Sequence, residues 1–248
     1  MVSLSYNPPA HRTWEKCARP VAQALPPLYC PIQPWADALH NHDPMPMTAF
    51  EKLLMNNRLR CWQQANITLP AFAKLGAALA GARVLEPGCG HGVGAELLIR
   101  RSGARQVDAF DVDARQLRRA KARATLGALP IQVWRGDIQR IAVRSNVYDA
   151  VVCFGVLHHA DNWRQALREL HRVLRPGGQL CLEESYAGFI LHPFWRRLMA
   201  HPTQDRFSGS TLLRELESVG FESIAEQHLA DAFGLVVCRK RTEAEPPV

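Results

Sequence analysis

Three acidic residues, each placed where a short apolar run ends, are the side chains of this sequence best suited to binding a ligand. Glu86 stands directly before a glycine-dense turn, Asp111 ends the next run, and Asp137 follows the third. Carboxylates accept hydrogen bonds from hydroxyl and amino groups and attract cations, whereas they repel phosphates. The spacing therefore indicates a ligand that carries hydroxyl groups and a positive charge.

The turn after Glu86 carries glycine at every second position, Gly88, Gly90 and Gly92, and it opens a predicted helix. Glycine lets the backbone take positive φ and lets a ligand approach more closely than a Cβ would permit. Dinucleotide enzymes share such turns, but with the spacing G-x-G-x-x-G. Here the spacing is G-x-G-x-G-x-G, and the carboxylate of Glu86 would repel a pyrophosphate. It suits an ammonium group, such as that of the methionine part of S-adenosylmethionine.

The other two acids fit the remaining parts of such a ligand. Asp111 can accept the hydroxyls of a ribose, the task of the acid at the second strand end in dinucleotide folds. Asp113 is predicted to cap the next helix, which leaves Asp111 for the ribose. Asp137 could accept the adenine amino group while Ile138 covers the ring. The alternative interpretation is that acids at strand ends only cap helices and turns.

These residues require a framework of alternating strands and helices. Apolar or β-branched runs predict strands over 83–86, 107–111, 131–135, 150–154 and 180–183. Amphipathic stretches between them predict helices over 93–101, 114–125 and 163–174. This alternation is typical of a parallel sheet with helices on both faces. Earlier in the chain, Thr48-x-x-Glu51 resembles a capping box, and a further helix is predicted over 70–80, ended by Gly81.

From about Arg83 to Glu184 the sequence resembles the class I S-adenosylmethionine-dependent methyltransferase family. The resemblance rests on the segments 83–94, 107–111, 135–138, 148–159 and 167–178. It implies an α/β, Rossmann-like sheet of seven mostly parallel strands with helices on both faces. The last two strands would lie near 221–227 and 233–239, the final one antiparallel.

The resemblance also implies S-adenosylmethionine as the cofactor and S-adenosylhomocysteine as its product. The residues that would bind this cofactor are Glu86, Gly88, Gly90, Gly92, Asp111, Val112, Asp137, Ile138 and Phe154.

Within that family the sequence is most similar to small-molecule enzymes of the quinone-methylating type. Enzymes of the family that methylate amino groups of nucleic acids carry an Asn/Asp-Pro-Pro-aromatic loop after the fourth strand, and this sequence has 154–159, FGVLHH, instead. We therefore predict methyl transfer to a small, hydrophobic or aromatic acceptor. The alternatives are a protein or RNA methyltransferase and a non-catalytic S-adenosylmethionine-binding partner subunit. The residues define neither the atom that is methylated nor an oligomeric state.

Two histidines follow the fourth strand, whose carboxyl end faces the transferred methyl group in this fold. Methyl transfer mainly requires alignment, but a nucleophile that arrives protonated needs a base, and histidine titrates near neutrality. His158 or His159 is therefore the candidate base or acceptor-orienting residue. The alternative is that Leu-His-His, which recurs in this family with many acceptors, serves the fold or the cofactor.

An apolar, aromatic stretch over about 185–210 follows the fifth strand, where the family commonly covers the acceptor. The candidate acceptor-binding residues within it are Tyr186, His192, Trp195 and Arg206. Such a stretch favours a hydrophobic acceptor or a membrane-facing lid. The alternative is a helix packed on the edge of the domain.

The ends of the chain predict a division into residues 1–80 and a methyltransferase domain over 81–241. Nine of the 17 prolines lie in the first 46 residues, which forbids long helices there and allows either a passive extension or a strap across the site. The seven cysteines show no C-x-x-C spacing and no metal-ligand spacing with histidines, so we predict no metal and no disulfide framework.

Composition sets the remaining expectations. Of the 248 residues, 47% are apolar and 21% charged, which is typical of a globular protein. The net charge of +7 admits an anionic partner, but the basic residues over 115–123 are interpreted as a solvated helix face or, alternatively, a nucleic-acid footprint. No apolar stretch of about 18 residues and no secretory signal are visible, so we predict a cytoplasmic protein without a transmembrane segment.

Overall fold

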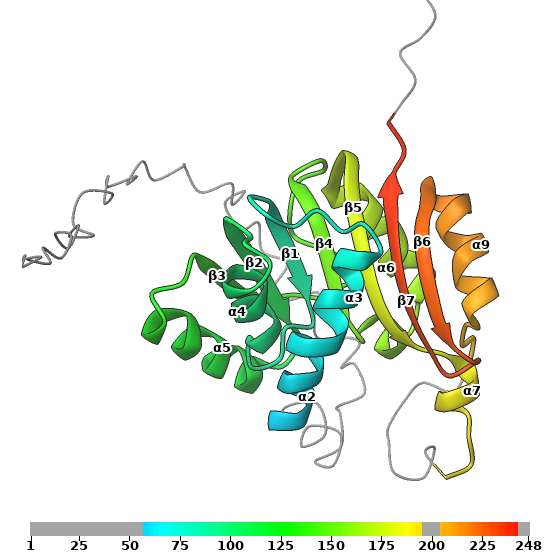
Figure 1. The fold of residues 1–248 in the computed structure, drawn as a ribbon, viewed down its shortest axis with the longest axis horizontal. Helices are drawn as coiled ribbons and strands as arrows, with labels where there is room; N and C mark the ends of the chain where they lie inside the picture. The colour runs from blue at the N-terminus through cyan, green and yellow to red at the C-terminus, as the bar shows by residue number, and fades with distance from the viewer. Residues whose placement is uncertain (1–56, 195–203, 243–248) are drawn as a thin grey trace, which may run out of the picture.

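The computed structural model describes residues 57–194 and 204–242. Within them, seven strands form one sheet in the order β3-β2-β1-β4-β5-β7-β6 (Figure 1). The strands are β1 (Arg83–Pro87), β2 (Gln106–Asp111), β3 (Ile131–Arg135), β4 (Tyr148–Phe154), β5 (Leu174–Ser185), β6 (Phe221–Leu229) and β7 (Phe233–Lys240). Neighbours among β1 to β5 pair in parallel, and β7 is antiparallel to both β5 and β6. The predicted fold class is confirmed.

Helices cover both faces of the sheet, as Figure 1 shows. One face carries the N-terminal helices α2 (Arg58–Gln63), η2 (Gln64–Thr68, a π-helix) and α3 (Leu69–Lys74), together with α4 (Val93–Arg100) and α5 (Ala114–Leu126). The other face carries α6 (Trp163–Val173) and α9 (Gly209–Val219). The short helices η3 (Leu157–His159) and α7 (Ala187–Ile190) follow β4 and β5.

Each face has its own apolar core, because alternate strand residues point to opposite sides. Val84 and Val152 pack with the helices of the first face, while Leu85 and Cys153 pack with α6 and α9. Strands buried on both faces explain the continuous apolar runs in the sequence. They hold the carboxyl ends of β1 to β5 along one edge, where a ligand binds in open parallel sheets.

The helix predicted over 70–80 was wrong in its length, since α3 ends at Lys74. Gly76 has a φ of +90°, which no helix residue adopts. The side chain of Gln179, from β5, accepts a hydrogen bond from the Ala78 amide at 2.7 Å and donates to the Gly76 carbonyl at 3.0 Å. This contact between distant segments replaces the hydrogen bonds that would have continued the helix.

Several expectations concern residues outside the described ranges. These are the capping box at Thr48, the strap over residues 1–46 and the role of Trp195. The division of the chain into residues 1–80 and 81–241 stays a prediction.

Candidate functional site

The glycine turn joins β1 to α4 at the carboxyl edge of the sheet. Gly88 has a φ of +65°, and a Cβ there would lie 2.5 Å from Val156 Cγ2. Gly92, the N-cap of α4, has a φ of +74°, and its Cβ would lie 3.1 Å from the Ala120 backbone. Both positions exclude other residues on conformation and on space. The turn is therefore held between β4 on one side and α5 on the other.

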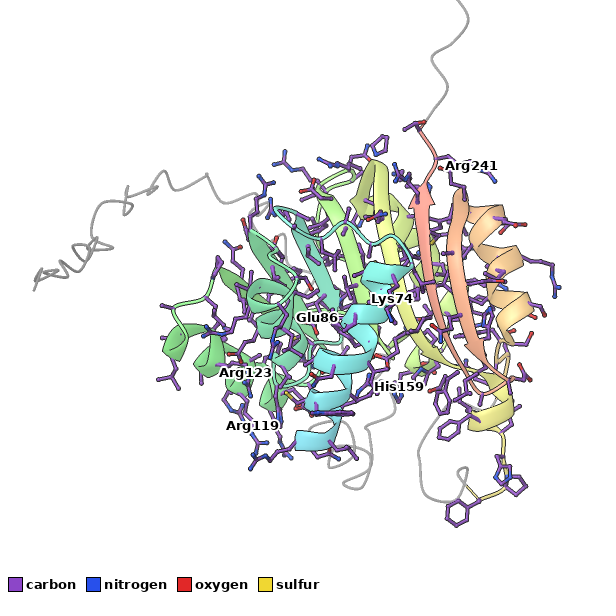
Figure 2. All side chains as sticks on the ribbon, in the orientation of Figure 1. Lys74, Glu86, Arg119, Arg123, His159 and Arg241 are labelled. Atoms are coloured by element: carbon purple, nitrogen blue, oxygen red, sulfur yellow. The ribbon has the colours of Figure 1, made fainter. Side chains whose placement is uncertain are left out.

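Glu86 lies in β1, one residue before the strand ends (Figure 2), and is 3% exposed. It accepts a hydrogen bond from the Ala95 backbone in the first turn of α4, and its Oε2 atom has no partner among the described residues. Burial raises the pKa of this carboxyl well above its usual range, and Asp111 raises it further. A buried carboxylate oxygen without a partner is costly unless a ligand supplies a donor or a cation. An ammonium group fits that requirement.

Asp111 lies at the end of β2, beside the glycine turn. Its Oδ2 accepts from the Gly90 amide at 2.9 Å and its Oδ1 from the Asp113 amide at 2.8 Å. Burial raises its pKa, while these amides act in the opposite direction. Asp113 caps α5 by accepting from the Arg115 amide, as predicted, whereas the ribose role of Asp111 stays a prediction. Each carboxylate oxygen of Asp111 retains a lone pair for a hydroxyl.

The predicted adenine side lies next to Asp111. The Gly136 amide donates to the Asp111 carbonyl at 3.2 Å, which brings the loop after β3 against the end of β2. In this loop Asp137 accepts from the Gln139 amide at 2.8 Å, and Ile138 is buried. Val112, which follows Asp111, is 38% exposed. The structure thus brings these residues to one place.

The loop after β4 holds both candidate histidines, and Figure 2 shows His159 at the carboxyl edge of the sheet. The rings of His158 and His159 lie 4.3 Å apart between centroids. His158 is 4% exposed, and its Nδ1 lies 2.7 Å from Glu184 Oε2. Phe154, at the end of β4, is buried with its ring against Gly94, where a Cβ would lie 2.8 Å from Cε2.

An N-terminal helix reaches this edge from the other direction. Arg60, in α2, binds Glu183 with two nitrogens at 2.7 and 3.0 Å and donates to the Phe154 carbonyl at 3.2 Å. Gln63 donates to the same carboxylate at 2.7 Å. Both partners of the ion pair are largely buried, with side chains 14% and 15% exposed. The pair fastens α2 across the ends of β4 and β5.

The predicted acceptor residues lie in different environments. Tyr186 is 1% exposed, with its hydroxyl 2.9 Å from His228 Nδ1. Arg206 is partly buried and donates to the carbonyls of His158 and Ala160 at 2.7 and 3.3 Å. His192 lies on the exposed segment after α7. Of these three, Arg206 contacts the histidine loop directly.

The described ranges hold no group of three or more His, Cys, Asp or Glu side chains arranged to take a metal ion. In the same part of the chain, every helix is too short or too polar to cross a membrane. The cysteines described there, Cys61, Cys89, Cys153, Cys181 and Cys238, are unpaired thiols.

Sequence reasoning missed Arg60, Gln63 and the separate tasks of Glu183 and Glu184. Glu183 and Glu184 could have been noted as two acids at the end of an apolar strand, where charge is unusual. Arg60 belongs to no motif, and its partner lies 123 residues away. No local pattern indicates such a pair.

The parallel sheet with an antiparallel β7, the glycine turn and the acids at successive strand ends define a class of protein. Residues 85–182 match the family described as Methyltransferase domain. This part of the chain is similar to class I S-adenosylmethionine-dependent methyltransferases, and a relative from Mycolicibacterium smegmatis, 32% identical over 152 residues, is named as a probable S-adenosylmethionine-dependent methyltransferase.

Relatives with known names share this domain. An uncharacterized methyltransferase of Mycobacterium tuberculosis is 37% identical over 131 residues, which cover 53% of this chain and 64% of the relative. A tRNA U34 carboxymethyltransferase of Methylococcus capsulatus is 36% identical over 122 residues, 47% of this chain and 37% of the relative. A phthiotriol/phenolphthiotriol dimycocerosates methyltransferase of Mycobacterium leprae is 32% identical over 102 residues, 41% and 37% of the two chains. The chain thus spans less than two thirds of the length of these relatives.

Solved structures share the fold. A SAM-dependent methyltransferase from Aquifex aeolicus superposes with a TM-score of 0.62 at 18% identity, covering 77% of this chain and 97% of the other.

Proposed function

We propose that this protein transfers a methyl group from S-adenosylmethionine to a small, hydrophobic or aromatic acceptor. When bound, S-adenosylmethionine supplies a methyl group already activated on a sulfonium. The tasks left to the chain are to hold the donor, orient the acceptor, exclude water and accept a proton where the acceptor carries one.

We call the part of the site at the ends of β1 to β3 the donor half. Binding of the methyl donor there is supported by the buried Oε2 of Glu86, which lacks a partner among the described residues. It lies behind a glycine turn whose φ angles permit close approach, and Asp111 contacts that turn through Gly90. An ammonium group would neutralise Glu86, ribose hydroxyls would reach Asp111, and Val112, Asp137 and Ile138 would surround an adenine ring. We propose these roles on the strength of that arrangement.

We call the part of the site at the ends of β4 and β5 the acceptor half. Its apolar character supports a hydrophobic acceptor. Exposed apolar side chains lie on α2 and in the segment after α7, near the ends of β4 and β5; they are Leu59, Trp62, Leu191 and Phe194. Apolar side chains exposed at this edge could contact a hydrophobic acceptor. Arg60, buried beside them, is already neutralised by Glu183. An uncharged acceptor therefore fits this half better than an anion.

The basic surface gives weaker support to an RNA acceptor, the alternative that one relative's name also raises. In α5, Arg119 lies 2.9 Å from His91 Nε2, and Arg123 donates to the His91 carbonyl and to Glu96. In Figure 2 both arginines lie below and to the left of Glu86. These two arginines bind His91, in the glycine turn, and Glu96, in α4, so part of the basic charge of α5 is used in contacts within the protein. That use favours the small-molecule proposal.

A methyl-transfer screen with a labelled donor tests the proposal. The full chain is incubated with labelled S-adenosylmethionine and three panels: quinones and phenols, bulk tRNA and rRNA, and unmodified protein. We expect label in an organic-soluble product from the first panel, and none with Asp111→Ala. Label in RNA or protein alone would overturn the acceptor class. Binding of S-adenosylhomocysteine with no transfer to any panel would favour a non-catalytic partner subunit.

A further inference from the structure

Glu184, at the end of β5, is the centre of a hydrogen-bond cluster that holds the loop after β4. Its Oε1 accepts from the amides of Val156 and Leu157 at 3.2 and 2.9 Å. Its Oε2 accepts from the His158 amide at 3.3 Å and lies 2.7 Å from His158 Nδ1. The side chain is 1% exposed. One buried carboxylate thus organises three consecutive amides and an imidazole.

We propose that Glu184 is a positioning residue that fixes His158 as the neutral tautomer protonated on Nδ1, so that Nε2 is the basic nitrogen of the acceptor site. The inference rests on the proposed function, since it assigns the base of that same reaction. It separates the two histidines: His158 is the base, and His159 stacks on its ring.

The tautomer follows from the donors that already surround the carboxylate. Three amide N–H groups point at Glu184, and each can only donate. A proton on Oε2 would have to share that oxygen with the His158 amide, whereas an ionised carboxylate accepts all four hydrogen bonds. A histidine nitrogen that faces a carboxylate is the one that carries hydrogen, and the other nitrogen then carries the lone pair.

Burial opposes the ionised carboxylate and raises the pKa of Glu184 to about 8, while the three amides act in the opposite direction. The charged and titratable neighbours of this pair are Glu183, which raises the pKa further, with Tyr186, Cys153, His159 and Arg206. The pair takes up one additional proton as a unit as the pH falls. The base is therefore competent on the alkaline side of that step.

In the proposed step the acceptor's heteroatom forms a bond to the methyl carbon while the carbon–sulfur bond breaks and its electron pair stays on sulfur. The proton of the heteroatom moves to His158 Nε2. The imidazolium that results carries a positive charge beside Glu184, which compensates it at 2.7 Å. Charge is conserved, because the sulfonium's positive charge is replaced by that of the imidazolium.

Nitrogen NMR of the full chain labelled in histidine tests the inference without an acceptor. Two-bond correlations at about pH 8.5 distinguish the two neutral tautomers, and His158→Asn assigns the signal. In the wild type we expect His158 with hydrogen on Nδ1. Glu184→Gln keeps the shape, and its amino group must replace either Oε1, which faces the Val156 and Leu157 amides, or Oε2, which faces Nδ1 and the His158 amide. The first position opposes two amide donors, so we expect the amino group to face Nδ1 and the Nδ1 tautomer to lose its dominance. Glu222→Gln, an exposed acid on β6, should leave the signal unchanged.

The outcomes separate the two proposals. A wild-type His158 with hydrogen on Nε2, or an unchanged tautomer in Glu184→Gln, would overturn the inference, and the wild-type measurement needs no variant that folds. Failure of the wild type to bind S-adenosylhomocysteine in calorimetry would instead overturn the proposed function. With an acceptor in hand, Glu184→Gln should lower kcat by about 10²–10⁴-fold, the usual contribution of a general base, with donor affinity and KM retained. Loss of affinity with kcat intact would indicate a structural role only.

Discussion

The two halves of the carboxyl edge are built differently. At the ends of β1 to β3 the contacts span shorter sequence separations: Asp111 accepts from the Gly90 amide 21 residues away and from the Asp113 amide two residues away. At the ends of β4 and β5 they join more distant segments, since Arg60 binds Glu183 across 123 residues and Arg206 binds the His158 carbonyl across 48. Under the proposed function, neighbouring strand–helix units would hold the donor, and segments from distant parts of the chain would surround the acceptor.

The halves also differ in how their carboxylates are satisfied. Glu86 keeps a buried oxygen without a partner among the described residues, whereas Glu183 has Arg60 and Gln63 and Glu184 has four donors. Under the proposed function, a ligand would supply the missing partner of Glu86 in the donor half, whereas Glu183 and Glu184 in the acceptor half already have partners in the protein. We expect donor-half variants to change affinity and acceptor-half variants to change stability or turnover.

The largest expected effect is that of Gly94→Ala in the donor half. A methyl group there would overlap Glu86 Oε1 and lie 2.8 Å from the ring of Phe154. Overpacking of a buried site costs about 1–3 kcal/mol and occasionally more, and here a carboxylate held by α4 must move. We expect lower stability in urea unfolding and no detectable S-adenosylhomocysteine binding in calorimetry. Arg100→Ala, exposed on the same helix, should change neither; wild-type affinity in Gly94→Ala would contradict the packing argument.

Breaking the ion pair of the acceptor half should come next. Arg60→Ala leaves the carboxylate of Glu183 largely buried without its cation. Removing one partner of a buried pair costs about 3–5 kcal/mol, reduced here because both side chains are partly exposed. Urea unfolding should show the loss, while calorimetry should show S-adenosylhomocysteine affinity close to the wild type. Arg60→Ala/Glu183→Gln should recover part of the stability, and a double variant that adds to the loss would contradict the pairing.

Asp111→Ala should weaken donor binding without unfolding the domain. Losing a hydrogen bond to a charged group costs about 1.5–3 kcal/mol, so calorimetry should show at least about tenfold weaker S-adenosylhomocysteine binding. Asp113→Ala is the matched control, because Asp113 is a neighbouring acid whose carboxylate caps α5. It should cost about 1 kcal/mol of stability with affinity nearly intact. Equal affinities in the two variants would remove the ribose assignment.

A smaller effect should appear in the pH dependence of stability. The folded Glu184–His158 pair holds an additional proton up to about pH 8, whereas an unfolded glutamate releases its proton near pH 4.3. The folded state therefore binds more protons over that window, and its stability falls as the pH rises through it. Urea unfolding of wild type at several pH values, set against Glu184→Gln, measures the difference. A wild type that gains stability relative to Glu184→Gln as the pH rises would contradict the raised pKa.

The smallest expected effect is that of metal removal. The cofactor of this family carries its own electrophile, and the described residues offer no cluster for a metal ion. We expect S-adenosylhomocysteine affinity and, with an acceptor, turnover to be unchanged by a chelator. Activity lost in the chelator and restored by magnesium would show that acceptor and metal bind together.

The sequence alone determined the fold class and the approximate strand positions, and it predicted the candidate donor residues at the strand ends. Strands buried on both faces are legible as apolar runs, and caps and glycine turns act within a few residues, as at Gly92 and Asp113. These local signals can be recognised in the sequence without knowledge of the tertiary structure. The boundaries of β3 and the start of α5 match the prediction to the residue.

Only the tertiary structure decided how the acceptor half is assembled. The Ala78 amide, which lies in the predicted helix over 70–80, donates to the side chain of Gln179 instead of to a helix carbonyl. Glu183 pairs with Arg60, which belongs to a helix without a recognisable motif. Glu183 and Glu184, adjacent in β5, point to opposite faces of the sheet, because successive side chains of a strand alternate. One fastens α2 and the other holds His158. Pairing energies of this kind depend on burial and distance in space, which sequence separation does not encode.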